Sequence, residues 1–309
     1  MFLPYQEPEC LTLELPEIAL REVSVKILRE DQNHEEVSGN KWWRLKYNLL
    51  QASMERKPIL TFGGAFSNHL YATAAAAACL KIPSIGIVRG GPFPTPGPTL
   101  EFVRQKGMAL HHISKEKYRE KESEEVIKEL HGLFGEFLVV PEGGSNEAAI
   151  RGCEEWGQKL LSTYDFDVVC LPVGSGGTVS GLIKAFGGRK EVIGFSALKD
   201  GAQLVEVIKK LSENSSNRWQ IESGFHFGGY AKTKPVLIDF MQKIYADKKL
   251  PLDAVYTSKA LWGLLALIEM GRFTPGQKIL FIHTGGLQGN LGFFNSKFPG
   301  VLRSHRAKA

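Results

Sequence analysis

The sequence predicts an α/β fold in which parallel strands alternate with helices. Short apolar runs rich in β-branched residues alternate with segments of helical periodicity along the 309-residue chain. Such alternation is typical of parallel sheets that are covered by helices on both faces. Three of the apolar runs lead directly into glycine-rich turns, at 63–64, 174–177 and 285–286. Ligands bind beyond the carboxyl ends of such strands, so we expect a site at these turns.

The predicted strands are, in order, 23–28, 58–62, 84–88, 137–140, 168–173, 192–195 and 278–283. The predicted helices are 43–55, 68–80, 99–106, 123–133, 146–162, 178–186, 204–211, 236–245 and 258–271. The charges at 115–128 alternate in sign, which predicts a solvated helix face. The Pro/Gly-rich stretch 90–98 and the polar stretch 214–217 are predicted loops, and 303–308 is expected to be a frayed tail.

The predicted strands fall into two groups, before and after about residue 160. We therefore expect two α/β domains. The smaller domain is predicted at 52–160, and the larger one is assembled from 1–51 and 161–309.

The composition is typical of a soluble globular protein, with 43% hydrophobic and 23% charged residues. The net charge of +5 comes from scattered basic residues, so no nucleic-acid surface is expected. The chain shows no apolar run of membrane-spanning length and no basic-then-apolar leader, so we expect a cytoplasmic protein without a membrane partner. The four cysteines form no CxxC pair and are expected to be free thiols. No metal site is expected.

One lysine stands out in the segment SGNKWWR at 38–44. Lys41 lies between a small flexible pair and two indoles. An amine that is desolvated near apolar rings and another cation loses its proton more easily, and only the neutral amine attacks a carbonyl. Lys41 is therefore a candidate Schiff-base lysine. Taken alone, the tetrapeptide SGNK would favour an exposed lysine in a surface turn, and the glycine-rich turns that follow reverse that interpretation.

The turn Gly174-Ser175-Gly176-Gly177-Thr178 lies between an apolar strand and a helix. Its glycines allow several backbone N–H groups to point at one anion, and the helix dipole adds to the effect. No lysine follows the last glycine, and the third glycine of a dinucleotide fingerprint is missing. The turn therefore predicts a phosphate site that is not a nucleoside triphosphate loop. A tight turn without a ligand is the alternative.

The turn at 63–69 opens a helix with Ser67, Asn68 and His69. Ser67 or Asn68 is expected to cap the helix, and the same amides and hydroxyl could hold a carboxylate. His69 alone is more often structural. Tyr256 and Tyr230 could each stack on a cofactor ring, although by themselves they would be assigned to the core.

Together these segments resemble the fold-type II pyridoxal phosphate enzymes. They are most similar to the branch that contains D-cysteine desulfhydrase and 1-aminocyclopropane-1-carboxylate (ACC) deaminase. The matching segments run in order along nearly the whole chain: SGNKWWRLKYNL at 38–49, GGAFSNH at 63–69, PTPGPTLEFVRQKGM at 94–108, PEGGSNEAAIRGC at 141–153, VGSGGTVSGL at 173–182, GGYAK at 228–232, LDAVYTSKALWGL at 252–264 and HTGG at 283–286.

The resemblance implies a two-domain, tryptophan synthase β-like fold of twisted parallel sheets. It also implies a homodimer with pyridoxal 5'-phosphate in the cleft between the domains. The residues implied to bind the cofactor are Lys41, Arg44, Asn68, Gly174, Ser175, Gly176, Gly177, Thr178, Tyr256, Thr257 and Thr284. The residues implied to be catalytic are Lys41, Ser67 and Tyr256. The residues implied to bind a small amino-acid substrate are Ser67, Asn68, His69 and Tyr230.

The residues at positions 257 and 284 distinguish the two enzyme types of this branch. ACC deaminases of this family have glutamate at the position of Thr257 and leucine at that of Thr284, whereas desulfhydrase-like members have small hydroxyl residues at both. A carboxylate beside the pyridine nitrogen would keep it protonated and strengthen the electron sink. A neutral hydroxyl implies a weaker sink, which is adequate for a good leaving group such as thiolate. The family usually has glutamine where this chain has Phe66, and Phe66, Trp42 or Trp43 could make the pocket more apolar.

The predicted function is therefore β-elimination from a small amino acid, with D-cysteine giving pyruvate, ammonia and hydrogen sulfide. Lys41 would release the cofactor and shuttle the α-proton, and Tyr256 could assist as acid or base. One alternative is ACC deamination to 2-oxobutanoate and ammonia. Another is a non-catalytic nucleotide-binding α/β protein, which would explain the glycine-rich turns but not Lys41 together with Ser67 and Asn68.

Overall fold

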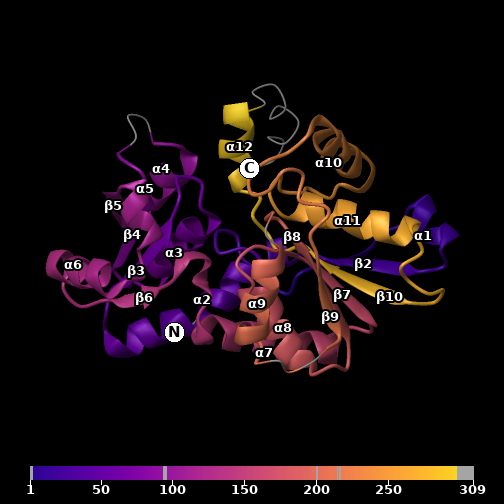
Figure 1. Cartoon of the computed structure of the whole chain (residues 1–309), viewed down its shortest axis with the longest axis horizontal. Helices are drawn as coiled ribbons and strands as arrows, with labels where there is room; N and C mark the ends of the chain where they lie inside the picture. Colours follow the sequence, from indigo (N-terminus) through magenta and orange to yellow (C-terminus); the bar gives the residue numbers. More distant parts are fainter. Residues whose placement is uncertain (1–2, 93–95, 200, 214, 216, 298–309) are drawn as a thin grey trace.

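The computed structural model describes residues 3–92, 96–199, 201–213, 215 and 217–297, and it confirms the predicted α/β fold. Figure 1 shows two sheets side by side, each flanked by helices. Among the described residues, the larger sheet has the strand order β1-β2-β10-β7-β8-β9 and the smaller one β5-β4-β3-β6. The neighbouring strands of both sheets are parallel, except for the antiparallel pair β1 and β2.

The strands are β1 (Cys10–Thr12), β2 (Ser24–Leu28), β3 (Ile59–Gly63), β4 (Ser84–Arg89), β5 (Ala109–Ile113), β6 (Leu138–Val140), β7 (Val168–Val173), β8 (Glu191–Ser196), β9 (Trp219–Glu222) and β10 (Lys278–Ile282). The helices are α1 (Pro16–Leu20), α2 (Asn40–Glu55), α3 (Asn68–Cys79), α4 (Pro98–Gln105), α5 (Lys115–Arg119), α6 (Glu124–Phe134), α7 (Glu147–Thr163), α8 (Gly177–Phe186), α9 (Gly201–Leu211), α10 (Pro235–Lys248), α11 (Thr257–Glu269) and α12 (Gly289–Lys297). Two short 3₁₀ helices are η1 (Glu30–Gln32) and η2 (Glu142–Gly144).

The larger sheet is covered on both faces because successive side chains of a strand point to opposite sides. Cys170 of β7 and Phe281 of β10 pack with α1, α10 and α11. Their neighbours Leu171 and Ile282 pack on the other face with α2, α7, α8 and α9. Both faces are therefore buried, which explains why these strands are continuous apolar runs in the sequence.

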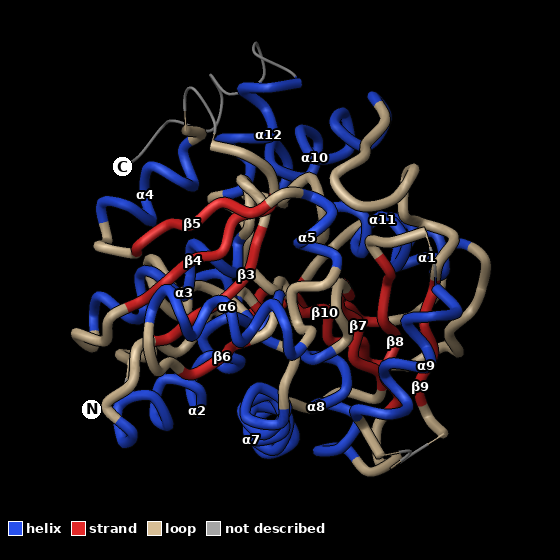
Figure 2. The backbone as a smooth tube through the Cα atoms, turned by 60° about the vertical axis from the view of Figure 1, so that its left-hand side comes forward, coloured by secondary structure: helices blue, strands red, loops and turns tan. Residues whose placement is uncertain are grey.

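The smaller sheet follows the same rule. Phe62 of β3 and Ile87 of β4 pack with α5 and α6, whereas Val88 packs with α3 and α4. Figure 2 shows the strands of the two sheets as two separate groups. Their strands come from 59–140 for the smaller sheet and from 10–28 and 168–282 for the larger one. The predicted domain limits fall within α2 and α7, and the division into domains stays a prediction.

The strands missing from the sequence-based prediction are β1, β5 and β9. All three lie at a sheet edge, where part of each strand is exposed. An edge strand needs no continuous apolar run, so its sequence carries a weak strand signal. The short helices α1 and α12 were also not predicted. The predicted loops 90–98 and 214–217 lie partly, and the predicted tail 303–308 entirely, outside the described residues.

Helix α2 begins at Asn40, three residues before its predicted start. Gly39 precedes it with a φ of 73°, a conformation that favours glycine. Lys41 therefore lies in the first turn of α2. The predicted site residues lie at the amino ends of α2, α3, α8 and α11 and at the carboxyl ends of β7 and β10, except for Tyr230, which lies in the loop between β9 and α10.

Candidate active site

Lys41 is partly buried at the start of α2. Burial, and then the positive charge of Arg44 one turn further on, hold the pKa of Lys41 well below its usual value. The backbone N–H of Asn40 donates to the carbonyl of Thr284 at 3.2 Å, which joins this helix start to the end of β10. Lys41 is therefore a fixed amine that loses its proton easily, the form that attacks a carbonyl.

Arg44 points into the glycine-rich turn at 174–178. Its guanidinium donates to the hydroxyls of Ser145 and Ser175, the latter at 3.1 Å. Arg44 is only 3% exposed, and among the described residues it forms no ion pair with a carboxylate. A buried cation without a counter-ion is costly unless an anion is supplied to it. Arg44 is therefore placed for an anionic ligand.

The turn itself is shaped for close backbone approach. Gly176 has a φ of 86° and precedes α8, and within the described chain no side chain caps that helix. A Cβ on Gly177 would lie 2.7 Å from the Arg44 Nη2 and 3.0 Å from the Ser145 Oγ. The free N–H groups of a helix start and a buried guanidinium suit a phosphate group. Asn40 donates to the Thr178 hydroxyl at 2.9 Å, which ties the turn to the Lys41 segment.

The turn that is predicted to bind a carboxylate contains a helix cap. Ser67 is the N-cap of α3, and its hydroxyl accepts the N–H of Leu70 at 3.2 Å, as expected for a helix cap. Asn68 follows on the first turn of the helix. A Cβ on Gly286 would lie 2.9 Å from the Asn68 Nδ2, so the α3 start and the turn after β10 are in contact.

His69 is buried with a defined tautomer. Thr61 donates its hydroxyl proton to the Val140 carbonyl at 2.7 Å, so the His69 Nε2–H must donate to the Thr61 oxygen at 2.8 Å. The Nδ1 atom of His69 is buried and has no partner among the described residues. Burial, followed by the charges of Lys41 and Arg44, holds the His69 pKa well below its usual value. His69 is a neutral acceptor beside the Lys41 end of the site.

Tyr256 and Tyr230 form a hydroxyl pair with ring centroids 6.1 Å apart. A Cβ on Gly174 would lie 3.1 Å from the Tyr256 ring, so this ring lies next to the first residue of the turn at 174–178. Burial, and then Tyr230 and Asp253, raise the Tyr256 pKa well above its usual value. Tyr256 therefore keeps its proton at neutral pH.

Thr257 and Thr284 differ in their contacts. Thr257 is 0% exposed, and its hydroxyl is bonded to Asp253. Thr284 is 7% exposed, and its backbone carbonyl accepts the N–H of Asn40. Thr284 thus contacts the start of α2, whereas the Thr257 hydroxyl is held by Asp253.

The two tryptophans considered as pocket lining lie in the core. Trp42 donates its indole N–H to the Pro4 carbonyl, and Trp43 donates to Glu30. Both indoles pack with Tyr5, and Trp43 also stacks on Trp156. The expectation that the tryptophans line the pocket is wrong, because they form core.

Phe66 is 50% exposed, and its ring lies near α12 and the start of α4. Its ring would be 2.5 Å from a Cβ on Gly292 of α12 and 3.4 Å from one on Gly97 before α4. Phe66 therefore packs between the start of α4 and α12.

Several supporting residues were not identified from the sequence. The Asn33 side chain forms two hydrogen bonds with Gly39. It donates to the Gly39 carbonyl at 3.1 Å and accepts the Gly39 N–H at 2.9 Å. Glu30 is fully buried and accepts from Asn33 and Trp43; burial raises its pKa to about 7. The run REDQN at 29–33 is an unusually polar sequence directly after a buried strand, which is a signal that could have indicated these roles.

A second pair of supporting residues lies under Thr284. Asp31 and His283 form a buried ion pair at 3.1 Å, and the His283 Nε2–H donates to the Pro251 carbonyl at 2.8 Å. Asp31 also accepts from Arg29 at 2.9 and 2.8 Å. The pair joins the segment after β2 to the end of β10.

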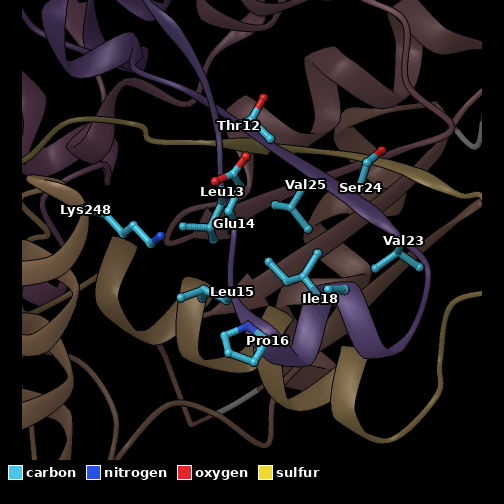
Figure 3. Close-up of a pocket in the computed structure, with 11 residues that line it drawn as sticks. Thr12, Leu13, Glu14, Leu15, Pro16, Ile18, Val23, Ser24, Val25 and Lys248 are labelled. Carbon is cyan, nitrogen blue, oxygen red and sulfur yellow. The ribbon is translucent and has the colours of Figure 1, made fainter.

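A surface hollow of about 500 Å³ lies apart from this site, between β1, α1, β2 and Lys248 of α10 (Figure 3). None of the predicted site residues lines it. Within the described ranges no helix is long and apolar enough to cross a membrane, and no three metal-ligating side chains of His, Cys, Asp or Glu cluster.

Comparison with known proteins gives consistent results. Residues 11–285 match the family model described as pyridoxal-phosphate dependent enzyme. A bifunctional D-cysteine desulfhydrase/1-aminocyclopropane-1-carboxylate deaminase of Arabidopsis thaliana, a mitochondrial protein, is 32% identical over 85% of this chain and 72% of its own length. A Pyrococcus furiosus protein with the provisional name 1-aminocyclopropane-1-carboxylate deaminase is 28% identical over 94% of this chain and 92% of its own length. A crystal structure of an ACC deaminase homologue superposes with a TM-score of 0.81, at 26% identity over 97% of this chain and 95% of that chain.

Proposed function

The chain belongs to the family of pyridoxal-phosphate dependent enzymes, and we propose that it catalyses an elimination from a small amino acid. The reaction we favour converts D-cysteine and one water molecule into pyruvate, ammonia and hydrogen sulfide. One C–S bond breaks, and the α-proton and the sulfur leave from neighbouring carbons. The name of the Arabidopsis relative, which includes D-cysteine desulfhydrase, supports this choice.

A single observation carries the proposal. The Lys41 amine, whose pKa is strongly lowered, lies one helical turn from Arg44, a buried guanidinium that has no carboxylate partner in the described part of the chain. Arg44 in turn meets the start of α8 at Gly177. A neutral amine and an anion site at this spacing suit an aldehyde that carries a phosphate, as pyridoxal phosphate does.

Pyridoxal phosphate, when bound, supplies an electron sink for negative charge at the α-carbon of an amino acid. In our proposal, Gly174 to Thr178 and Arg44 would hold the phosphate, and Lys41 would hold the aldehyde carbon until the substrate amine displaces it. Ser67 and the first N–H groups of α3 bind the substrate carboxylate. Lys41 then accepts the α-proton, and Tyr256, which keeps its proton at neutral pH, donates to the departing sulfur.

ACC deamination is the second candidate, since the names of both relatives support it. It consumes one ACC and one water molecule and yields 2-oxobutanoate and ammonia. Against it stands the absence of an acidic side chain at position 257. The replacement of Thr284 by Leu, together with Thr257→Glu, is expected to move the kcat/KM ratio toward ACC. A preference of the unmodified protein for ACC would reverse our choice of substrate.

A visible absorption spectrum tests the cofactor, because a non-catalytic nucleotide-binding protein would remain colourless. A product assay across D-cysteine, L-cysteine, D-serine, β-chloro-D-alanine and ACC then tests the substrate. We expect pyruvate and sulfide from D-cysteine in stoichiometric amounts. Binding of the cofactor with no turnover of any of the five would contradict the proposed reaction while leaving the family unaffected.

We further propose that the chain works as a cytoplasmic homodimer. The proposal extends the family resemblance and the absence of a spanning helix from the described residues. Sedimentation of the purified protein tests the dimer, and a monomeric mass would exclude it.

A further inference from the structure

Lys259 is a buried lysine that the proposed mechanism leaves unused. It lies in the first turn of α11 and is only 2% exposed. Lysine is almost never fully buried unless its amine is bonded. The Lys259 Nζ atom donates to the backbone carbonyl of Gly229 at 2.9 Å, 30 residues earlier in the chain. The buried amine therefore reaches from α11 to the loop that carries Tyr230.

The Gly229 carbonyl anchors a tight turn. It accepts the backbone N–H of Lys232 at 3.1 Å as well as the Lys259 amine. A carbonyl oxygen has two lone pairs, so these two donors use both of them. Tyr230 lies inside this turn, directly after Gly229. A shift of the Gly229 carbonyl would therefore move Tyr230.

The loop around this turn has an unfavourable backbone conformation. Phe227 and Ala231 each have a φ of 52°, which is rarely adopted by residues that carry a side chain. The two glycines after Phe227 have φ values of 100° and 106°. Such conformations persist only where the surrounding structure fixes them. Lys259 supplies one fixed contact, and Trp262 of α11 supplies another through its edge-to-face contact with Phe227, with ring centroids 5.5 Å apart.

The same helix start holds the other tyrosine of the pair. Tyr256 is the N-cap of α11, three residues before Lys259. Its ring centroid lies 6.1 Å from that of Tyr230, and the two hydroxyls interact. The first turn of α11 thus fixes Tyr256 directly and Tyr230 through the Gly229 carbonyl. Tyr230 is 49% exposed, so its ring is accessible from solvent.

We propose that Lys259 is a positioning residue that holds the Tyr230 hydroxyl against the Tyr256 hydroxyl. Because its amine is buried and bonded to the Gly229 carbonyl, Lys259 acts through the backbone of the loop. Without that bond, the loop would leave its unfavourable conformation and the two hydroxyls would separate. The inference rests on the proposed function, in which the Tyr256 hydroxyl is the proton donor.

The first test is hydrogen exchange of the cofactor-free, full-length chain, measured by mass spectrometry over residues 226–232. Lys259→Met removes the amine and keeps a long, unbranched side chain. We expect the amides of this segment to exchange about tenfold faster, the order of magnitude for the loss of one buried hydrogen bond. Lys243→Met replaces an exposed lysine of α10 and is the matched control, which should exchange like the unmodified protein.

The second test is a double-mutant cycle of Lys259→Met and Tyr230→Phe, with kcat/KM for D-cysteine as the readout. We expect each single variant to lower kcat/KM about tenfold. We expect the double variant to match Tyr230→Phe alone, because Lys259 acts through Tyr230. Lys243→Met should leave kcat/KM unchanged.

Other results would overturn the proposal. Unchanged exchange at 226–232 together with a lower Tm of Lys259→Met would make Lys259 a support of α11 only. Additive losses of kcat/KM would mean that Lys259 does not act through Tyr230. If Lys259→Met does not fold, Lys259→Gln, whose amide is too short to reach Gly229, decides alone, and unchanged exchange counts against the proposal. If the unmodified protein turns over none of the substrates, the proposed function fails, whereas the exchange measurement still decides whether Lys259 fixes the loop.

Discussion

Lys41 owes its proposed reactivity to where α2 begins. The positive φ of Gly39 lets the helix start at Asn40, so that Lys41 and Arg44 lie one turn apart on the same face. Burial and this neighbouring cation both favour the neutral amine. A lysine displaced by one residue would lose that alignment.

Lys41→Ala is expected to abolish turnover and the visible band while the fold survives. The reason is that the variant removes the amine without disturbing the Asn40 bond to Thr284. The matched control is Lys46→Ala on the same helix, which removes a lysine that pairs with Glu155. A borohydride-reducible coloured band that persists in Lys41→Ala would show that another lysine holds the cofactor.

In the turn at 174–178, glycine is required at two positions for two different reasons. At Gly176 the requirement is its φ of 86°, and a side chain there would point toward Ile208, at 3.1 Å from the Cβ. A Gly176→Val substitution would therefore be unfavourable because of its backbone angle. At Gly177 the requirement is space beside Arg44 and Ser145.

Gly177→Ala is expected to weaken pyridoxal phosphate binding about tenfold or more, because the methyl group displaces the Arg44 guanidinium from a charge-assisted bond. The measurement is a cofactor titration followed by fluorescence. Gly132→Ala, where a Cβ would meet nothing within 4 Å, is the control and should bind normally. If both variants bound pyridoxal phosphate with the same affinity, Gly177 would not be part of the phosphate site.

At the scale of elements, the Asp31–His283 pair ties the chain after β2 to the carboxyl end of β10. Burial opposes the charge of His283, but Asp31 and the Pro251 carbonyl outweigh it and raise the His283 pKa. Burial likewise opposes the charge of Asp31, but His283 and Arg29 lower its pKa. The folded state therefore favours the charged form of both groups, and the pair lies next to Thr284, which contacts the start of α2.

The sign of the pH dependence follows from these directions. A raised His283 pKa contributes stability that is complete below about 6.5, the usual histidine value, and is lost as pH rises through the folded value. A lowered Asp31 pKa contributes stability above about 3.9 that is lost as pH falls through the folded value. The full contribution is therefore expected between these limits.

His283→Gln should lower the free energy of unfolding of the cofactor-free protein by about 3 kcal/mol near pH 6, since it leaves a buried carboxylate partly unpaired. The difference from the unmodified protein should shrink as pH rises above the folded His283 pKa. Urea unfolding at pH 6 and pH 9 measures both values, and Glu30 contributes equally to each protein. A difference that is the same at both pH values would contradict the charged state assigned to His283.

At the scale of the whole molecule, helices join the parts of the chain that carry the two sheets. Helix α2 packs against α7 and α3, and α12 contacts α4 (Figure 1). Phe66 lies at the second of these contacts, against Gly97 and Gly292. Its position joins the helices of the smaller sheet to the last described helix of the chain.

Phe66→Gln is therefore expected to leave the ratio of kcat/KM for D-cysteine and ACC unchanged within about twofold. Its effect should instead be a loss of about 1 kcal/mol of stability, because half of the ring is already exposed. Steady-state kinetics with both substrates and thermal unfolding test this. If the ratio of the two kcat/KM values changed while the stability did not, Phe66 would be assigned to the substrate pocket.

The sequence by itself determined the α/β fold, the segments that form the central strands and the glycine-rich turns. Buried parallel strands must be continuous apolar runs, and close backbone approach needs glycine, so both leave a local record. The motifs that resemble one enzyme family also pointed to Lys41, the phosphate turn and the cofactor. The family match over 11–285 confirms the family and the cofactor, whereas the individual residue roles stay predictions.

Only the tertiary structure decided which side chains meet across the fold. It placed Trp42 and Trp43 in the core, turned Phe66 toward α12 and joined Asp31 to His283 across 252 residues of chain. It also assigned the Thr257 proton to Asp253. Hydrogen-bond direction and burial depend on atoms that are distant in sequence, and no local pattern encodes them. The polarity of the site is therefore a property of the folded chain.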